Sequence, residues 1–294
     1  MTLRENLAST PLDSHRLRPN QNLVSHKGIP FHTNQWGFRC KKEPSLLPNA
    51  TNLLLGGDSI AFGMYLPFEQ SLGHHLQLKL NLNFNVLVSA IPGGSQAMSH
   101  DLLFGPDQLA QKVKAKWLLH SVNHYDDNDN WLYEIDEEKR RGLRGELRKA
   151  KNLLGPYAIQ MLQLKTRHFL SKDQRKDLLL YADEIPQPNP TKWGHTQRAL
   201  EKLQKVCLDS GIHLALFFLP DRGELSSQGD QHNDTMEAWA KAQSIPFLDL
   251  EKLLEREPPS LKEQLFKSDG IHLTPSGSQT VAKHLAFFMN GLEL

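Results

Sequence analysis

The chain has 294 residues, in which 34 lysine and arginine side chains balance 33 aspartate and glutamate side chains. A net charge close to zero creates no overall field that attracts a polyanion, so we expect no nucleic acid partner. Cys40 and Cys207 are the only cysteines, which are too few for a disulfide framework or a cysteine-based zinc cage.

The hydropathy pattern gives no indication of a membrane segment. The sequence has no run of about 18 apolar residues, and its first residues lack a basic segment followed by an apolar core. We therefore expect no stable membrane insertion and no signal peptide. This favours a cytoplasmic location, or an association with the cell envelope if a leader has been removed.

Residues 1–50 are polar and rich in turn formers, and we interpret them as an N-terminal arm packed on the core. Trp36 and Phe38 are candidates to dock this arm, and Asn34 and Arg39 to hydrogen-bond it. The alternative role for Arg39 is to meet an anionic group of a substrate.

From residue 51 onward, apolar runs alternate with helical periodicity. Strands are predicted at about 52–57, 84–89 and 117–122. Leu72, Leu76 and Leu80, four residues apart, mark one face of a helix over 69–80. A strand–helix alternation of this kind predicts parallel strands joined by right-handed crossovers.

A segment at about 128–206 interrupts this alternation, and we interpret it as a helical insertion. It begins with charged residues and continues with a broad apolar face, which either packs on the core or covers an acyl pocket as a lid. Two more predicted strands follow, at 213–219 and 245–248. The prediction is one α/β domain over 51–294, a three-layer α/β/α fold with a five-stranded parallel sheet.

The predicted strand at 52–57 ends in Gly56-Gly57-Asp58-Ser59, which places a serine at a strand tip. In open α/β sheets, ligands bind at the carboxyl ends of the strands. Ser59 is therefore a candidate nucleophile, although Gly-Asp-Ser also occurs in ordinary turns.

Three further features follow other elements of the predicted fold. A glycine turn containing Gly93 follows the second strand, and Asn123 follows the third. Asp269 and His272 lie just before the last predicted helix, for which Thr274 is a plausible N-cap. A carboxylate three residues from a histidine can hydrogen-bond the imidazole and leave its other nitrogen free to act as a base.

Together these pieces resemble the four sequence blocks of the SGNH hydrolases, the family of GDSL esterases and lipases. The block order agrees, and the resemblance extends over about residues 30–290, because Asn34-Gln35-Trp36-Gly37-Phe38-Arg39 is similar to an arm that precedes the first block in many bacterial members. The matching residues are Ser59 in Gly57-Asp58-Ser59, Gly93, Asn123, and Asp269 with His272.

The resemblance implies a flavodoxin-like SGNH hydrolase fold and a serine esterase that forms an acyl-enzyme on Ser59. His272 would be the general base, and Asp269 would orient it. The oxyanion hole would consist of the backbone N–H groups of Ser59 and Gly93 and the side-chain amide of Asn123. The implied substrate is a small-molecule, glycan or lipid ester, and no cofactor or metal is implied.

The chain departs from the family pattern in its third block. His124 stands where the family usually has aspartate, and Ser121 stands where it usually has glycine. Asp126 and Asp127 are candidates for the structural role of the missing aspartate. The 14 histidines do not show a spacing typical of a metal site.

Other functions remain open on the sequence alone. The same machinery would serve an acyltransferase that passes the acyl group to a sugar hydroxyl, and a catalytically silent module would use the crevice only to bind an ester or a glycan. A flavodoxin-like nucleotide binder is disfavoured, because the first turn lacks Gly-x-Gly-x-x-Gly and no phosphate-binding lysine follows Gly57.

Overall fold

The computed structural model describes residues 17–24, 28–41, 46–80, 83–127, 129–130, 133–134, 193–226 and 231–292. Most of the predicted insertion at 128–206, including its candidate lid, lies outside the described residues. The last part of that range belongs to helix α8 (Trp193–Asp209).

The five predicted parallel strands are confirmed. In spatial order they are β5 (Phe84–Val88), β4 (Thr51–Gly56), β6 (Ala115–Val122), β7 (His213–Phe218) and β8 (Phe247–Asp249). All neighbouring pairs among them are parallel. The first strand of the parallel core along the chain is β4. The next strand, β5, lies on one side of β4, and β6 lies on the other, so the tips of these three strands form a topological switch point.

The sheet is larger than predicted, because part of the arm joins it. Strands β1 (Asn22–Val24), β2 (Pro30–Thr33) and β3 (Arg39–Cys40) pair antiparallel with one another, and β3 pairs with β5 through Arg39 and Val88. The described sheet therefore has eight strands, five of them in the predicted parallel core. These three strands lie among the turn formers of residues 1–50, so the sequence there predicts an arm and not strands.

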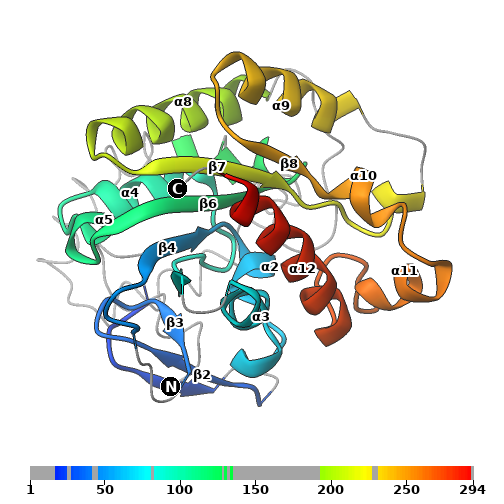
Figure 1. The fold of residues 1–294 in the computed structure, drawn as a ribbon, viewed down its shortest axis with the longest axis horizontal. Coiled ribbons are helices and arrows are strands. Elements are labelled where there is room, and N and C mark those ends of the chain that lie inside the picture. The colour runs from blue at the N-terminus through cyan, green and yellow to red at the C-terminus, as the bar shows by residue number, and fades with distance from the viewer. Residues whose placement is uncertain are drawn as a thin grey trace, which may run out of the picture.

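Helices cover both faces of the sheet and make three layers (Figure 1). One face carries α3 (Leu72–Lys79), α10 (Leu250–Leu254), α11 (Pro259–Leu265) and α12 (Pro275–Gly291), and the other carries α4 (Gln96–Phe104), α5 (Leu109–Lys112), α8 and α9 (Gln231–Ala242). The three-layer α/β/α prediction is therefore correct.

Alternating side chains of the strands supply the two cores. In β4, Leu53 and Leu55 belong to the hydrophobic cluster under α3 and α12, and Leu54 belongs to the cluster under α4 and α8. All three leucines are fully buried. This explains why the strand reads as a continuous apolar run, as expected for a strand covered on both faces.

Arg39 fastens the antiparallel strands to the segment after Ser59. Its guanidinium donates hydrogen bonds to the carbonyls of Phe62, Gly63 and Leu66, and it lies over the rings of Phe31 and Phe62. Burial lowers the pKa of Arg39 to about 9. Arg39 thus has the structural role expected for the arm.

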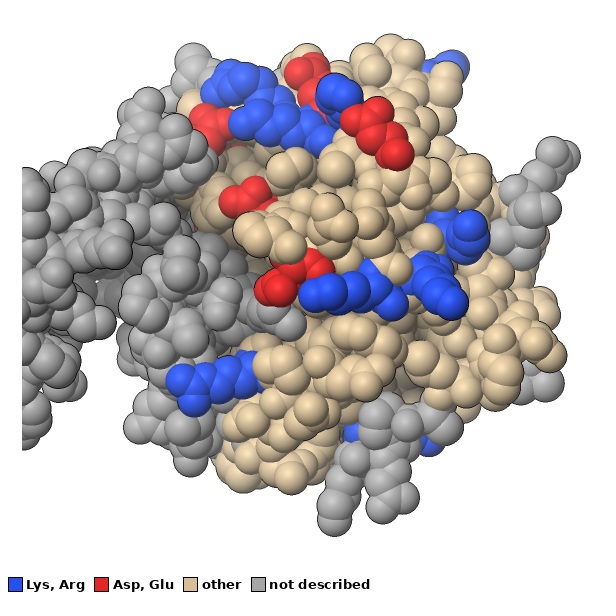
Figure 2. Space-filling model, turned by 90° about the vertical axis from the view of Figure 1, so that its left-hand side faces the viewer, with Lys and Arg blue, Asp and Glu red and all other residues tan. Residues whose placement is uncertain are grey.

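Surface charge follows the balanced composition. On the face shown in Figure 2, lysine and arginine side chains are interspersed with acidic ones and with a broad uncharged area. None of the described helices is long and apolar enough to span a bilayer.

Candidate active site

The turn after β4 places Ser59 at the first position of the short helix α2 (Ser59–Phe62). Asp58 caps this helix, because its Oδ1 accepts hydrogen bonds from the N–H groups of Ile60 and Ala61. Gly57 has a φ of +135°, and a Cβ added there would come within 1.9 Å of Ser121 Oγ. The sharp turn that exposes Ser59 therefore requires glycine at position 57.

Ser59 forms a continuous hydrogen-bonded relay with His272 and Asp269, which lie more than 200 residues later in the chain. Ser59 Oγ lies 3.0 Å from His272 Nε2, and His272 Nδ1 lies 3.0 Å from Asp269 Oδ2. With the imidazole proton on Nδ1, Nε2 is free to accept the serine proton. This is the geometry that nucleophile activation requires.

The loop before α12 fixes this orientation. Asp269 Oδ1 accepts hydrogen bonds from the backbone N–H groups of Ile271 and His272, at 3.0 and 2.9 Å. Burial raises the pKa of Asp269, but these hydrogen bonds and the nearby imidazole outweigh it and hold the pKa below its usual value. The edge of the Tyr65 ring packs against the imidazole, with 4.4 Å between ring centroids. Thr274 caps α12 as predicted.

Two backbone donors at this edge of the sheet are unused. The N–H groups of Ser59 and Gly93 have no hydrogen-bond partner among the described residues. Gly93 has a φ of +69°, and apart from its chain neighbours no atom of the described residues lies within 4 Å of where its Cβ would be. The turn after β5 therefore offers a bare backbone with open space beside it, which suits the approach of a substrate.

Asn123 follows β6 and is almost fully buried. Its Nδ2 donates a hydrogen bond to Asp58 Oδ2 at 3.0 Å, and its Oδ1 accepts one from the N–H of Tyr125. Since an amide nitrogen carries two hydrogens, one remains after the bond to Asp58. Burial raises the pKa of Asp58, against the opposing effect of the hydrogen bonds from Ile60, Ala61 and Asn123.

A buried polar network lies behind Asn123, and Asp126 is the member of it that the sequence indicated. Asp126 Oδ2 accepts hydrogen bonds from the backbone N–H of Asn123 and from Gln96 Nε2, at 2.9 and 2.7 Å. Asn130 joins the network through Gln96 Oε1 and the hydroxyl of Thr196 in α8. Asp126, one of the two candidates for the missing aspartate, therefore braces the asparagine turn. Burial and the nearby Asp58 carboxylate raise the pKa of Asp126.

A second connection runs through the turn after β7 and was not predicted from the sequence. Tyr125 donates its hydroxyl hydrogen to Asp221 Oδ2 at 2.8 Å. The next residue, Arg222, donates its backbone N–H to Gly270 O at 2.8 Å and its Nη2 hydrogens to Phe266 O and Lys267 O. This turn therefore links the loop after Asn123 to the loop that carries Asp269 and His272.

His124 packs against this same turn, with Nδ1 2.7 Å from Glu224 Oε1 and Nε2 3.8 Å from Asp221 Oδ2. These three side chains could geometrically hold a cation. However, the carboxylates of Asp221 and Glu224 already accept hydrogen bonds from each other's backbone N–H groups. The carboxylates at this position are thus used to shape the turn.

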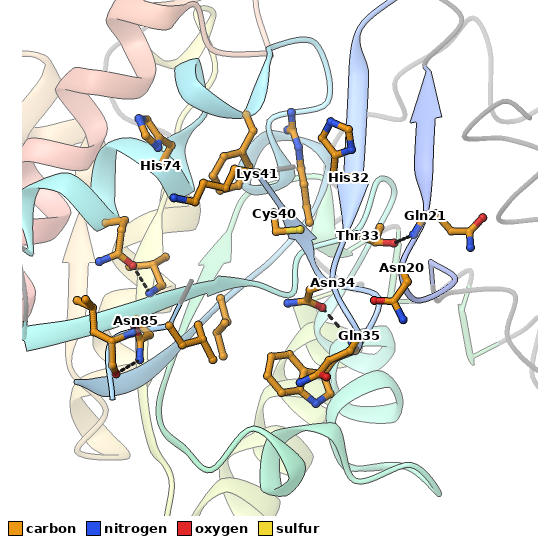
Figure 3. A pocket seen from close by; sticks show the side chains of 18 of the residues that line it. Asn20, Gln21, His32, Thr33, Asn34, Gln35, Cys40, Lys41, His74 and Asn85 are labelled. Carbon is orange, nitrogen blue, oxygen red and sulfur yellow. Dashed lines mark hydrogen bonds between the residues drawn. The ribbon is translucent and has the colours of Figure 1, made fainter. Parts of the chain in front are cut away.

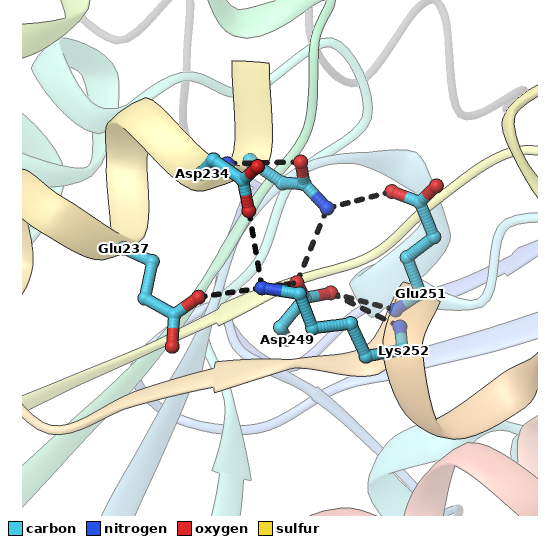
Figure 4. A network of polar contacts seen from close by, with 6 residues as sticks. Asp234, Glu237, Asp249, Glu251 and Lys252 are labelled. Atoms are coloured by element: carbon cyan, nitrogen blue, oxygen red, sulfur yellow. Dashed lines mark hydrogen bonds and ion pairs between the residues drawn. The ribbon is translucent and has the colours of Figure 1, made fainter. Parts of the chain in front are cut away.

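Another group of acids in the described residues, Asp234, Glu237 and Asp249, surrounds an ammonium group (Figure 4). Lys252 Nζ lies 3.1, 2.7 and 3.1 Å from their carboxylate oxygens. The hydrogen bond with Glu237, and those with Asp249 and Asp234, raise the pKa of Lys252. Lys252 therefore already supplies the positive charge that a cation would bring, and the network joins α9, β8 and α10.

The cavity that touches the relay is small. It has a volume of about 10 Å³ and is lined by Ser59 and His272 together with residues of α2, of the segment that follows α2 and of the end of the loop before α12: Ile60, Gly63, Met64, Tyr65, Leu66 and Leu273. A volume of this size is close to that of one water molecule.

No protein-family model and no curated protein matches the chain. Among solved structures, it is similar to a lipolytic protein of the G-D-S-L family from Veillonella parvula, with 13% identity, a TM-score of 0.48 and coverage of 83% of this chain and 100% of that chain. It is also similar to a catalytic mutant of Axe2, an acetylxylan esterase from Geobacillus stearothermophilus, with 14% identity, a TM-score of 0.47 and coverage of 84% and 98%.

A third similar structure is Est24, a carbohydrate acetylesterase from Sinorhizobium meliloti, with 10% identity, a TM-score of 0.48 and coverage of 83% and 100%. The G-D-S-L family is the one that the sequence motifs resemble.

Proposed function

We propose that the protein is a serine esterase of the SGNH hydrolase type. The observation that carries the proposal is the relay from Ser59 through His272 to Asp269, with both hydrogen bonds at 3.0 Å. A binding module has no need of an aligned nucleophile, base and carboxylate. Nucleophilic catalysis needs all three in this order.

In this mechanism Ser59 Oγ attacks the ester carbonyl carbon while His272 Nε2 takes the hydroxyl proton. The Asp269 carboxylate stabilises the imidazolium that forms. Collapse of the tetrahedral intermediate breaks the bond to the alcohol oxygen, which receives the proton from His272. Water then attacks the acyl-enzyme with the same proton transfers, which releases the acid and regenerates Ser59.

The oxyanion would accept hydrogen bonds from the free N–H groups of Ser59 and Gly93 and from the second amide hydrogen of Asn123. The bond between Asn123 and Asp58 supports this role, because it holds the amide in one orientation. Removal of one such donor typically slows a reaction by roughly a hundredfold to a thousandfold. Asn123→Ala should therefore lower kcat by an amount in that range.

The proposed substrate is an ester with a short acyl group. A cavity beside Ser59 and His272 supports this choice, because its volume of about 10 Å³ is far too small to enclose a long acyl chain. A series of p-nitrophenyl esters from acetate to palmitate tests it directly. We expect the highest kcat/KM for acetate or propionate, and a maximum at eight carbons or more would contradict the short-acyl proposal.

Hydrolysis must also be separated from acyl transfer. The test is to measure products from p-nitrophenyl acetate with and without a free sugar acceptor. We expect acetate as the main product in both cases. A larger yield of acetylated sugar than of acetate would show that the same relay serves a transferase.

A further inference from the structure

A cavity of about 660 Å³ lies apart from the relay, in the wedge between the antiparallel strands and the parallel core (Figure 3). Within the described residues, β3 pairs with β5 through Arg39 and Val88 alone, and the cavity lies beside this short contact. The cavity shares none of its described lining residues with the small cavity beside Ser59. Its volume is within the range of small-molecule sites.

The back wall of this cavity is held in place by hydrogen bonds of its own. Gln77 of α3 donates to Phe84 O and accepts from the N–H of Val86, both at 2.7 Å, and thereby covers the edge of β5. Asn85 bonds both the N–H and the carbonyl of Leu47, at 2.8 and 3.0 Å. The cavity is therefore formed before any ligand arrives, which lowers the entropic cost of binding.

The groups that remain for a ligand are polar and mostly uncharged. The side chains of Asn20, Gln35 and Lys41 have no hydrogen-bond partner among the described residues, and Figure 3 places them around the cavity with His32 and His74. An amide both donates and accepts, as a sugar hydroxyl does. A half-buried indole, Trp36, lines the same cavity and offers an apolar surface beside the amides.

The charged side chains that line the cavity indicate the charge of the ligand. No aspartate or glutamate occurs among the described residues that line the cavity, and the guanidinium of Arg39 is bound to backbone carbonyls of the segment after Ser59. Lys41 thus provides the exposed positive charge. A single ammonium among amides suits one carboxylate, whereas a polyphosphate calls for several cationic groups or a helix N-terminus.

We propose that this cavity binds a saccharide that carries a carboxylate, such as a uronic acid unit. The amides bond sugar hydroxyls, the Trp36 ring packs against the sugar's C–H face, and Lys41 pairs with the carboxylate. The proposal concerns binding alone and stands whether or not the protein hydrolyses esters.

Isothermal titration calorimetry on the full chain tests the proposal with two probes, trigalacturonate and the neutral cellotriose. We expect saturable binding of trigalacturonate and at least about tenfold weaker binding of cellotriose, a difference that one desolvated ion pair can supply. Absence of binding for trigalacturonate at 5 mM would overturn the proposal. Equal affinity for both probes would overturn the role of the carboxylate.

Variants of exposed lining residues locate the site. Gln35→Ala combined with Lys41→Ala should weaken trigalacturonate binding by at least about tenfold. Lys116→Ala, which removes an exposed lysine outside the cavity, is the matched control and should leave binding unchanged. If the double variant binds trigalacturonate as tightly as the parent chain, the sugar binds elsewhere and the proposal is wrong.

Hydrolysis of p-nitrophenyl acetate by the same variants keeps this inference separate from the esterase proposal. Gln35 and Lys41 do not touch the relay, so we expect the esterase rate to stay within about twofold while sugar binding is lost. Loss of both together would contradict a separate site. Binding without any esterase activity would leave the saccharide site standing and refute only the esterase.

Discussion

At the scale of single residues, the position of Ser59 depends on the glycine two residues before it. Gly57 has a φ of +135°, and its absent Cβ leaves room for the Ser121 hydroxyl. The family resemblance has glycine at position 121, and the serine here makes the contact with Gly57 tighter. Any side chain at position 57 would therefore destabilise the fold in two ways, by backbone strain and by a clash with Ser121.

Gly57→Ala should destabilise the fold by about 2–5 kcal/mol and abolish esterase activity, because the turn must move to relieve the clash. Urea unfolding and p-nitrophenyl acetate hydrolysis measure the two effects. Gly28→Ala is the matched control, since Gly28 has a φ of +76° and no atom of the described residues, its chain neighbours aside, lies within 4 Å of where its Cβ would be. It should cost only about 1–2 kcal/mol and leave activity intact. Equal costs at the two positions would show that the contact with Ser121 is unimportant.

A buried histidine makes stability depend on pH. His120 in β6 is fully buried, with ring nitrogens bonded to Ser99 Oγ and the carbonyl of Ser121. Burial lowers the pKa of His120 from 6.5 to about 4. Between these two values the unfolded chain binds a proton at this site and the folded chain does not, so folding stability falls as the pH falls.

We therefore expect His120 to contribute a loss of about 2 kcal/mol in folding stability between pH 7 and pH 5. The measurement is the free energy of unfolding in urea at both pH values for the wild type and His120→Gln. The comparison isolates His120, because Asp58 and Asp126, whose raised pKa values act in the opposite direction, are present in both proteins. An identical pH dependence in the two proteins would contradict the assignment.

At the scale of elements, the turn after β7 positions the catalytic loop. Arg222 touches none of the proposed reacting atoms, but its backbone and side chain hold the carbonyls of Phe266, Lys267 and Gly270. Because Gly270 lies between Asp269 and His272, its hydrogen bond with Arg222 helps to fix the loop in which Asp269 orients His272. Arg222 is thus a positioning residue.

Arg222→Ala should lower kcat by about tenfold or more while KM for p-nitrophenyl acetate changes little, because the relay is misaligned and the substrate site is kept. Arg222→Lys, which can still donate to the carbonyls, should recover part of the loss. Arg256→Ala is the control, because it removes an exposed arginine between α10 and α11. An unchanged kcat in Arg222→Ala would refute the positioning role.

For the molecule as a whole, the parallel core could be predicted from sequence, because four of its five strands are mostly apolar segments of five to eight residues with crossover helices between them. The addition of β1, β2 and β3 to the sheet could not, because these strands are short and their pairing depends on long-range contacts such as that of Arg39 with Val88. The boundary between the arm at 1–50 and the domain at 51–294 remains a prediction.

The candidate site also has a part that the sequence indicates and a part that only the structure shows. Ser59, Gly93, Asn123, Asp269 and His272 each sit in a short motif at the end of an element, so the sequence indicates them. Their supporting contacts join residues that are distant in the chain, as with Asn123 and Asp58 or Gln96 and Asp126. Asp126 was indicated by its place three residues after Asn123. The spacing of Asp221 and Glu224, typical of reciprocal capping, is a further local signal of these supporting contacts, from which no prediction was drawn.

The proposed esterase depends above all on the activation of Ser59 by His272. The second-order rate of covalent labelling with a fluorophosphonate measures this activation, and mass spectrometry of the labelled peptide identifies the labelled residue. We predict labelling on Ser59, none in Ser59→Ala, and a rate at least about a hundredfold lower in folded His272→Ala. Labelling that persists in Ser59→Ala would show that Ser59 is not the nucleophile, and an undiminished rate in His272→Ala would show that His272 does not activate it.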